Sequence, residues 1–152
     1  MLRPTFVAIV VAISAAGAAV AGDTAVETAE RRALETMDAF MEAFNAGDAR
    51  RWAGTLNYPH VRIAGGAVRV SQNAGEYAGR FSFDEFRRRT GWHHSVWDEK
   101  KIVQSSAEKV HIVVQFTRYR ADDSKIASYR SLYIVTNDNG HWGVQARSSF
   151  AP

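Results

Sequence analysis

Two histidines, His60 and His94, are the side chains of this 152-residue chain best suited to move protons. The ordinary pKa of an imidazole is about 6.5, so a histidine at a pocket wall can exchange a proton near neutral pH. The alternative for His60 is a histidine that only hydrogen-bonds its surroundings at a strand start. Tyr58 could donate to an oxyanion, or it could pack with its hydroxyl in water. We name His60 and His94 as candidate catalytic residues and leave these alternatives open.

Three arginines, Arg118, Arg130 and Arg147, lie on segments that alternate apolar and polar residues. A guanidinium among aromatic side chains holds a carboxylate, phosphate or carbonyl oxygen through a planar pair of N–H groups. The competing interpretation is stacking on tyrosine rings and pairing with aspartates at an exposed or dimer face. We predict Arg118 and Arg147 as ligand-binding residues, and we expect Arg120 to end its strand.

Several other reactive chemistries lack their sequence signatures. The chain has no cysteine, which removes disulfides, thiolate nucleophiles and lipoprotein anchors. His93 and His94 are neighbours on an expected strand and point to opposite faces, so only one could join a metal site. A nucleophile elbow, a phosphate-binding glycine loop and a dinucleotide fingerprint do not occur. We therefore expect no metal and no cofactor. The formal charge of +3, with no basic run longer than three residues, also argues against a nucleic-acid partner.

Residues 1–21 differ in composition from the rest and have the pattern of a secretory signal peptide. Arg3 supplies a positive start, an apolar stretch follows from Phe6, and Ala19-Val20-Ala21 has the small-x-small pattern that signal peptidase reads. The apolar stretch is shorter than the roughly twenty residues that span a bilayer, although an uncleaved anchor is the alternative. We expect Sec export to the periplasm or the exterior, with no membrane contact by the mature domain, residues 22–152.

The hydrophobic periodicity changes once along the chain, near Pro59. Before it, apolar residues recur every three to four positions from Asp23 to Ala46, which predicts a long amphipathic helix. Asp48 could cap a short second helix that presents Trp52 and Leu56. The remainder predicts a hairpin at 60–72, a helix capped by Ser82, and antiparallel strands at 92–106, 109–121, 125–136 and 141–150. Strands this long are expected to bend through bulges, and the order indicates a single α+β domain.

The two faces of the strand at 109–121 differ in character but are both partly apolar. Val110, Ile112, Val114 and Phe116 share one face with Arg118, while the other face carries Val113 and Tyr119 among polar residues. Burial on one side does not account for apolar groups on both. We therefore expect helices in front of the sheet and a partner copy behind it.

The element order resembles that of the nuclear transport factor 2-like superfamily, which includes ketosteroid isomerases and SnoaL-like polyketide cyclases. Two short motifs carry the resemblance, Phe44-Asn45-Ala46-Gly47-Asp48 and the turn at Gly140-His141-Trp142, and it runs from about Thr28 to Phe150. It implies N-terminal helices packed on a strongly curved antiparallel sheet, a cone of the cystatin-like α+β roll type with an apolar pocket. It also implies a homodimer formed through the sheet.

Isomerases of this superfamily carry a carboxylate base on the first strand after the proline turn. The matching position here falls near Ile63 or Ala64, and neither side chain can accept a proton. Three hypotheses follow. The first is an exported SnoaL-like domain that binds a partly apolar small molecule with an oxygen or acid group. The second is an enzyme (isomerase, cyclase or dehydratase) that uses a pocket histidine, and the third is a non-catalytic dimeric interaction module. The remaining residues predicted to bind ligand are Tyr58, Phe40, Phe44, Trp92 and Tyr129.

Overall fold

The computed structural model describes residues 16–152, with side chains described from residue 24 onward. Helix α1 (Ala16–Ala46) already covers positions before the predicted start at Asp23. Most of the predicted signal peptide, residues 1–15, lies outside the described residues, and the rest of it belongs to α1. No helix within the described part is long and apolar enough to cross a membrane.

The apolar stripe of α1 faces the sheet, as its spacing predicts. Ala29, Ala33, Met37, Phe40 and Phe44 are all buried, which places one residue of the stripe on nearly every turn. The helix ends at Gly47, whose φ of 68° allows its amide to bond the Phe44 carbonyl at 3.0 Å. This confirms the predicted end of the helix.

The segment after Gly47 differs from the sequence prediction. Asp48 caps α2 (Ala49–Ala53) by accepting a hydrogen bond from the Arg51 amide at 2.9 Å, and Trp52 is buried as expected. Leu56, however, belongs to strand β1 (Leu56–Ala64) and not to a helix. The strand begins before Pro59 because Leu56 pairs with Val144 on the last strand, a long-range contact that local periodicity does not reveal.

Three elements follow β1 before the long strands begin. Strand β2 (Ala67–Ser71) completes the predicted hairpin, and α4 (Phe83–Thr90) has the predicted cap, in which the Ser82 hydroxyl accepts from the Glu85 amide at 3.2 Å. Between them lies α3 (Ala74–Gly79), where the sequence analysis expected only a break. Asn73 initiates α3 by accepting a hydrogen bond from the Glu76 amide at 2.9 Å, so the residue interpreted as a breaker is an N-cap.

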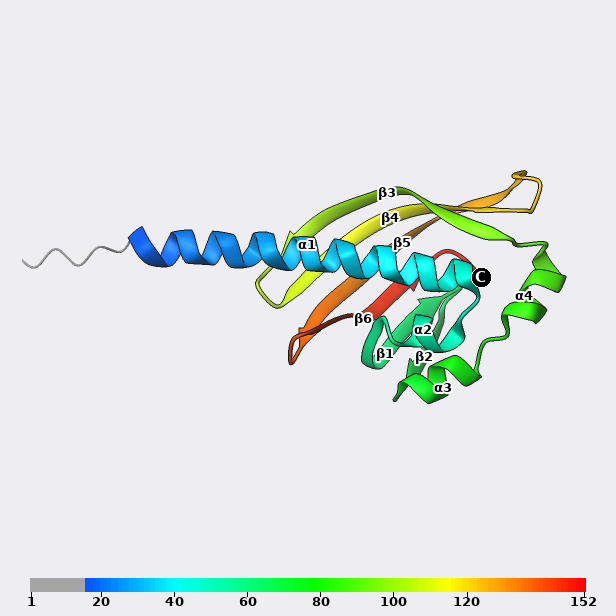
Figure 1. Cartoon of the computed structure of the whole chain (residues 1–152), viewed down its shortest axis with the longest axis horizontal. Helices are drawn as coiled ribbons and strands as arrows, with labels where there is room; N and C mark the ends of the chain where they lie inside the picture. Colours follow the sequence, from blue (N-terminus) through cyan, green and yellow to red (C-terminus); the bar gives the residue numbers. More distant parts are fainter. Residues whose placement is uncertain (1–15) are drawn as a thin grey trace, which may run out of the picture.

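Six strands form one curved sheet in the order β2-β1-β6-β5-β4-β3 (Figure 1). The four long strands are antiparallel neighbours with bulges in each of their ladders, which confirms that part of the prediction. The sheet is mixed, however, because β1 runs parallel to β6. The four long strands are β3 (His94–Ser105), β4 (Lys109–Tyr119), β5 (Lys125–Asp138) and β6 (His141–Ser149).

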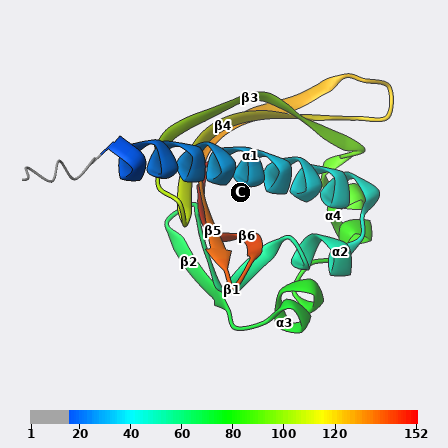
Figure 2. The same ribbon diagram turned by 60° about the vertical axis from the view of Figure 1, so that its left-hand side comes forward.

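The helices lie on the inner side of this curved sheet, with α1 running across it and α2, α3 and α4 grouped at one end (Figure 2). On β4, Val110, Ile112, Val114 and Phe116 are buried on this concave face, as predicted. The α+β fold with N-terminal helices packed on a curved sheet is therefore confirmed. The opposite, convex face leaves Val113 and other apolar side chains exposed.

Candidate functional site

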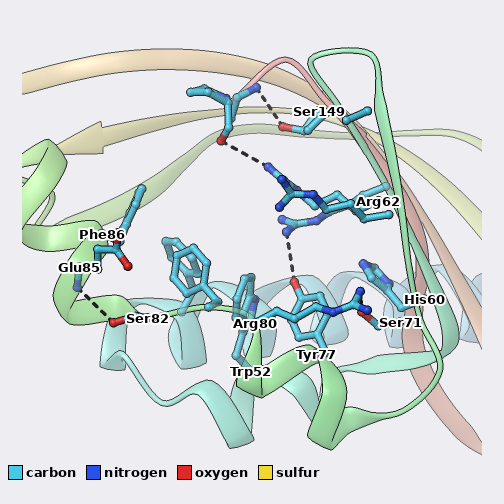
Figure 3. A pocket seen from close by; sticks show the side chains of 18 of the residues that line it. Trp52, His60, Arg62, Ser71, Tyr77, Arg80, Ser82, Glu85, Phe86 and Ser149 are labelled. Atoms are coloured by element: carbon cyan, nitrogen blue, oxygen red, sulfur yellow. Dashed lines mark hydrogen bonds between the residues drawn. The ribbon is translucent and has the colours of Figure 1, made fainter.

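A cavity of about 400 Å³ opens between the group of short helices and the concave face of the sheet. The end of α1, helices α2, α3 and α4, and strands β1, β2, β4 and β6 all contribute to its lining. Figure 3 shows its labelled side chains, among them His60, Arg62, Arg80 and Tyr77, arranged around the open space. The volume is within the range typical of small-molecule sites.

Nearly all the charged side chains that line this cavity are positive. Six arginines line it, and Glu85 is the single carboxylate side chain among the described residues that do so. Arg80 is paired with Glu76 on its own helix. The other five arginines form no ion pair within the described part of the chain. These five are Arg62, Arg69, Arg89, Arg118 and Arg147.

Arg147 lies deepest among the aromatic side chains. Its guanidinium carbon is 5.4 Å from the ring centre of Phe40 and 5.5 Å from that of Trp52. Its Nη2 donates to the Tyr77 hydroxyl at 3.1 Å. Burial acts to lower the pKa of Arg147, but its interactions with Tyr77 and Tyr133 outweigh that effect and raise the pKa. The side chain is therefore a fixed positive charge held by neutral groups.

Arg118 is surrounded by rings on the other side of the cavity. Its guanidinium carbon lies 4.9 Å from the ring centre of Phe86, 5.0 Å from that of Tyr129 and 5.6 Å from that of Phe116. Burial lowers the pKa of the Arg118 guanidinium. Cation–π contacts stabilise such a group, and a hydrogen bond with Tyr129 uses only part of its five N–H donors.

Arg62 is part of a row of arginines that crosses three strands. It is paired in register with Arg69 on β2 and with Arg147 on β6, so the three side chains leave the sheet on the same face. Arg62 donates to the main-chain oxygen of Pro152 at 3.3 Å. Burial, together with the nearby charge of Arg147, lowers the pKa of Arg62 to about 10. Burial is the larger cause of this shift, and repulsion by Arg147 adds to it.

His60 lies at the base of the cavity and is almost completely buried, with 1% of its surface exposed. Its Nδ1 lies 2.9 Å from the carbonyl oxygen of Val144, which requires that Nδ1 carries the proton and donates. The ring is 5.2 Å from Tyr77, edge to face. Burial and the charges of Arg147 and Arg62 lower the pKa of His60 to about 4. His60 is therefore neutral at neutral pH, with Nε2 as an acceptor.

The buried polar atoms without a hydrogen-bond partner gather at this cavity. Within the described residues there are five such side-chain atoms: Trp52 Nε1, His60 Nε2, Arg62 Nε, Arg118 Nε and Arg147 Nε. All five residues line the cavity. Four of these atoms are N–H donors, and only His60 Nε2 is an acceptor. Native proteins leave few buried polar atoms unpaired, so this end of the molecule differs from the rest of the core.

Aromatic side chains provide the apolar wall. Phe44, Trp52, Phe81 and Phe86 line the cavity and touch one another, with ring centres 5.0 Å apart for Phe44 and Trp52 and 5.4 Å apart for Phe81 and Phe86. Their edge-to-face and tilted contacts fix the wall against rearrangement. The site therefore combines a rigid apolar surface with unpaired cationic donors.

The structure brings four of the predicted site residues to this cavity: His60, Phe44, Arg118 and Arg147. Two others lie beside it. Phe40 lines a small adjoining cavity of about 30 Å³ that shares Phe44, Arg118 and Arg147 with the larger one, and Tyr129 contacts Arg118.

Three predicted residues lie elsewhere. His94 is stacked on Tyr119 at 5.2 Å and lies 3.8 Å from the Asp123 carboxylate, so it belongs to a different edge of the molecule. Tyr58 donates to the Ala53 carbonyl at 2.8 Å, and burial raises its pKa. Trp92 is a core residue whose Nε1 donates to Ser95. None of these three residues lines the large cavity.

Four important lining residues were not predicted, namely Arg62, Arg69, Trp52 and Tyr77. A signal for the two arginines was present, because Arg62 and Arg69 are symmetrically placed about the Gly65-Gly66 turn and therefore face each other across the hairpin. Tyr77 could not be placed because helix α3 was missed. Among residues 16–152, no three His, Asp or Glu side chains cluster as metal ligands would.

Comparisons with known proteins agree with this architecture. The profile of a family described as NTF2-like protein (DUF6841) matches residues 29–149. No functionally curated protein matches the chain significantly. Among solved structures, a Nostoc punctiforme protein of unknown function with a cystatin-like fold shares 13% sequence identity over 80% of this chain and 89% of its own, with a TM-score of 0.65.

Two further structures are similar at the level of the fold. A protein from Catenulispora acidiphila, solved in complex with S-DNPA, shares 13% identity over 80% of this chain and 91% of its own, with a TM-score of 0.63. A ketosteroid isomerase-like protein from Erwinia carotovora shares 20% identity over 78% of this chain and 93% of its own, with a TM-score of 0.53. Given the family match over residues 29–149, the chain belongs to the NTF2-like DUF6841 family.

Proposed function

We propose that this domain binds a partly apolar small molecule that carries an acid group, with the cavity beside α3 and α4 as its site. The observation that carries the proposal is the set of lining arginines that form no ion pair with a side chain of the described residues, among them Arg62, Arg69, Arg118 and Arg147. An acid group supplies the acceptors and the negative charge that these residues lack. The aromatic wall accommodates the apolar part of the ligand.

Binding without turnover accounts for the site better than acid–base catalysis does. A general base needs a pKa near the working pH and an accessible lone pair. The pKa of His60 is lowered to about 4 by burial, and its Nε2 is fully buried. Glu85, the one lining carboxylate of the described residues, is exposed on α4. An isomerase, cyclase or dehydratase that uses His60 would need a rearrangement to expose Nε2.

The similar structures are compatible with a binding role. The Catenulispora acidiphila protein was solved in complex with S-DNPA, and the Erwinia carotovora protein is described as ketosteroid isomerase-like. At 13% and 20% identity these proteins support the shared fold, and they do not transfer a ligand or an activity to this chain.

The first test is to identify what the protein carries. Gently purified protein is weighed intact under native conditions and again after denaturation, and any released small molecule is identified by mass. The proposal predicts an acidic molecule with an apolar part.

A matched pair of variants then tests the site. Arg147→Gln is expected to weaken an aryl carboxylate such as benzoate about 10- to 100-fold, because a charge-assisted hydrogen bond is lost. Arg130→Gln is the control, since Arg130 is exposed on the convex face of the same sheet. Equal affinity for benzoate in the parent and in Arg147→Gln would contradict the proposed role of this cavity.

Export and dimer formation are further parts of this proposal. Export is supported by the signal-peptide pattern of residues 1–21, and N-terminal sequencing of the protein from its native host would locate the cleavage site. A homodimer through the sheet is supported by the exposed apolar residues Ile63, Val68 and Val113 on the convex face. Analytical ultracentrifugation tests it, with Val68→Lys expected to shift the protein toward monomer.

A further inference from the structure

We propose that the acid group bound here is a phosphate monoester, and that the ligand is an aromatic ring carrying this phosphoryl group. The inference rests on the proposed function, since it specifies the ligand class of the same cavity. Its basis is the row formed by Arg69, Arg62 and Arg147, which are consecutive cross-strand neighbours on β2, β1 and β6.

The geometry of this row brings three positive charges together. Neighbouring strands lie about 4.8 Å apart, so three in-register residues occupy roughly 10 Å of the sheet. Like charges directly opposite each other destabilise a sheet. Arg62 and Arg147 are nevertheless held beside each other without a carboxylate partner in the described chain. An arrangement with this cost is retained where the charges serve a ligand.

The number of donors favours a phosphoryl group over a carboxylate. A carboxylate has two oxygens and one charge, and one arginine can satisfy it through a bidentate contact. A phosphate monoester offers three terminal oxygens and a charge of about −1.5 to −2 at pH 7. Of these two groups, the phosphate monoester is the better match for three guanidinium groups on neighbouring strands.

Competing partners for the row are few. Arg80 lies close by, but it is already paired with Glu76 and donates to the Val70 carbonyl at 2.9 Å. Arg62 has one acceptor, the main-chain oxygen of Pro152, and Arg147 has the hydroxyl groups of Tyr77 and Tyr133. The exposed Arg69 has no contact within the described chain that would hold it away from a ligand.

The cavity next to the row determines the rest of the ligand. Trp52, Phe81 and Phe86 form its aromatic wall, and Arg118 is held between rings. A planar ring can stack on such a wall. A volume of about 400 Å³ accommodates a ring with its phosphoryl group.

The test is isothermal titration calorimetry of the purified protein with four probes: phenyl phosphate, phenyl sulfate, benzoate and inorganic phosphate. We expect phenyl phosphate to bind about 10-fold or more tightly than each of the others, because only it combines the ring with two charges. Phenyl sulfate has the same tetrahedral shape with one charge, so it separates charge from shape. Equal affinity for phenyl sulfate would overturn the inferred role of the second negative charge. Equal affinity for inorganic phosphate would overturn the inferred role of the aromatic ring.

Two variants and a pH series complete the experiment. Arg62→Gln and Arg69→Gln should each weaken phenyl phosphate about 10-fold and benzoate by less, while Arg130→Gln changes neither by more than about 2-fold. Because Arg69 is exposed, its variant keeps the test valid if Arg62→Gln fails to fold.

Phenyl phosphate affinity should rise between pH 5.5 and 7.5 as its second proton leaves at a pKa of about 6, while benzoate affinity stays flat.

The outcomes distinguish this inference from the function on which it rests. If benzoate binds as tightly as phenyl phosphate and Arg147→Gln weakens both, the phosphate inference is overturned and the acid-binding function stands. If neither aromatic acid binds, both are overturned.

Discussion

The two ends of the concave face of the sheet are covered by helices in different ways. At the closed end, the small residues Ala29 and Ala33 from the middle of α1 and the residues Val110 and Ile112 of β4 are all at most 1% exposed. At the end covered by α2, α3 and α4, larger aromatic residues surround a cavity. A single long helix fills the closed end, whereas short helices leave space at the open end.

Polar atoms are distributed according to the same division. All the unpaired buried polar side-chain atoms of the described residues lie at the open end. The closed end consists of aliphatic side chains, which need no partners. The core therefore supplies the stability of the domain, and the open end holds the polar groups that the packing of the domain leaves unpaired. If this division is correct, stability and ligand affinity should respond to different substitutions.

The largest effect is expected from a truncation at the closed end. Ile112→Ala should lower the free energy of unfolding by about 2–5 kcal/mol, because a fully buried side chain is removed and a cavity remains. Urea denaturation measures the loss, and Ile112→Val should cost only about 0.5–1.5 kcal/mol. Ligand affinity of the folded variant should not change. A substantial loss of affinity would show that the two ends are not independent.

The next largest effect concerns His60, a polar group at the base of the open end. Its pKa is about 4 in the folded protein and about 6.5 in an unfolded chain, so the unfolded state binds the proton more readily. The stability that this neutral histidine contributes is complete above pH 6.5 and is lost as the pH falls toward 4. The predicted loss is about 3 kcal/mol.

Unfolding free energies measured from pH 7 to pH 4 test this prediction. His60→Asn preserves a donor for the Val144 carbonyl and should flatten the pH dependence by that amount. His111→Asn, on the opposite face of the sheet, serves as the control. An unchanged slope in His60→Asn would show that the acid sensitivity comes from the carboxylates.

A third prediction separates affinity from stability at one residue. Arg147→Met retains the volume of the side chain and removes a charge that has no carboxylate partner. Ligand binding should weaken by about 1.5–3 kcal/mol, while the free energy of unfolding changes by about 1 kcal/mol or less. Calorimetric titration with benzoate and urea denaturation measure the two quantities. A loss of several kcal/mol in stability would instead make Arg147 part of the structural core.

Much of the closed end could be predicted from the sequence, because its residues follow simple periodicities. The stripe of α1 and the alternation of Val110, Ile112 and Val114 each indicate which face is buried. The capping pattern at Ser82 and Glu85 was also sufficient to locate α4. These features depend on neighbours within a few positions along the chain.

The open end was harder to predict because it depends on long-range pairing. Arg62 and Arg147 are far apart in sequence and meet only because β1 pairs with β6 in parallel, a connection that local patterns do not specify. His60 was identified by residue type, but its tautomer is set by Val144 across that same pairing. His94 was also identified by residue type, and its strand position places it against Tyr119 and outside the lining of the cavity.

The smallest effect concerns α3, the helix that sequence patterns missed and the one that carries Tyr77 against Arg147. Its Asn73 cap accepts the Glu76 amide at 2.9 Å, so Asn73→Ala should cost about 1 kcal/mol in the free energy of unfolding. Asn73→Ser should restore most of this, because a serine hydroxyl caps a helix nearly as well. If the open end is the less stable one, hydrogen exchange of α3 amides should accelerate in Asn73→Ala while that of Ile112 and Val114 amides stays slow. Equal acceleration at both ends would mean that they unfold as one unit, and the division between a structural end and a binding end would then describe packing but not stability.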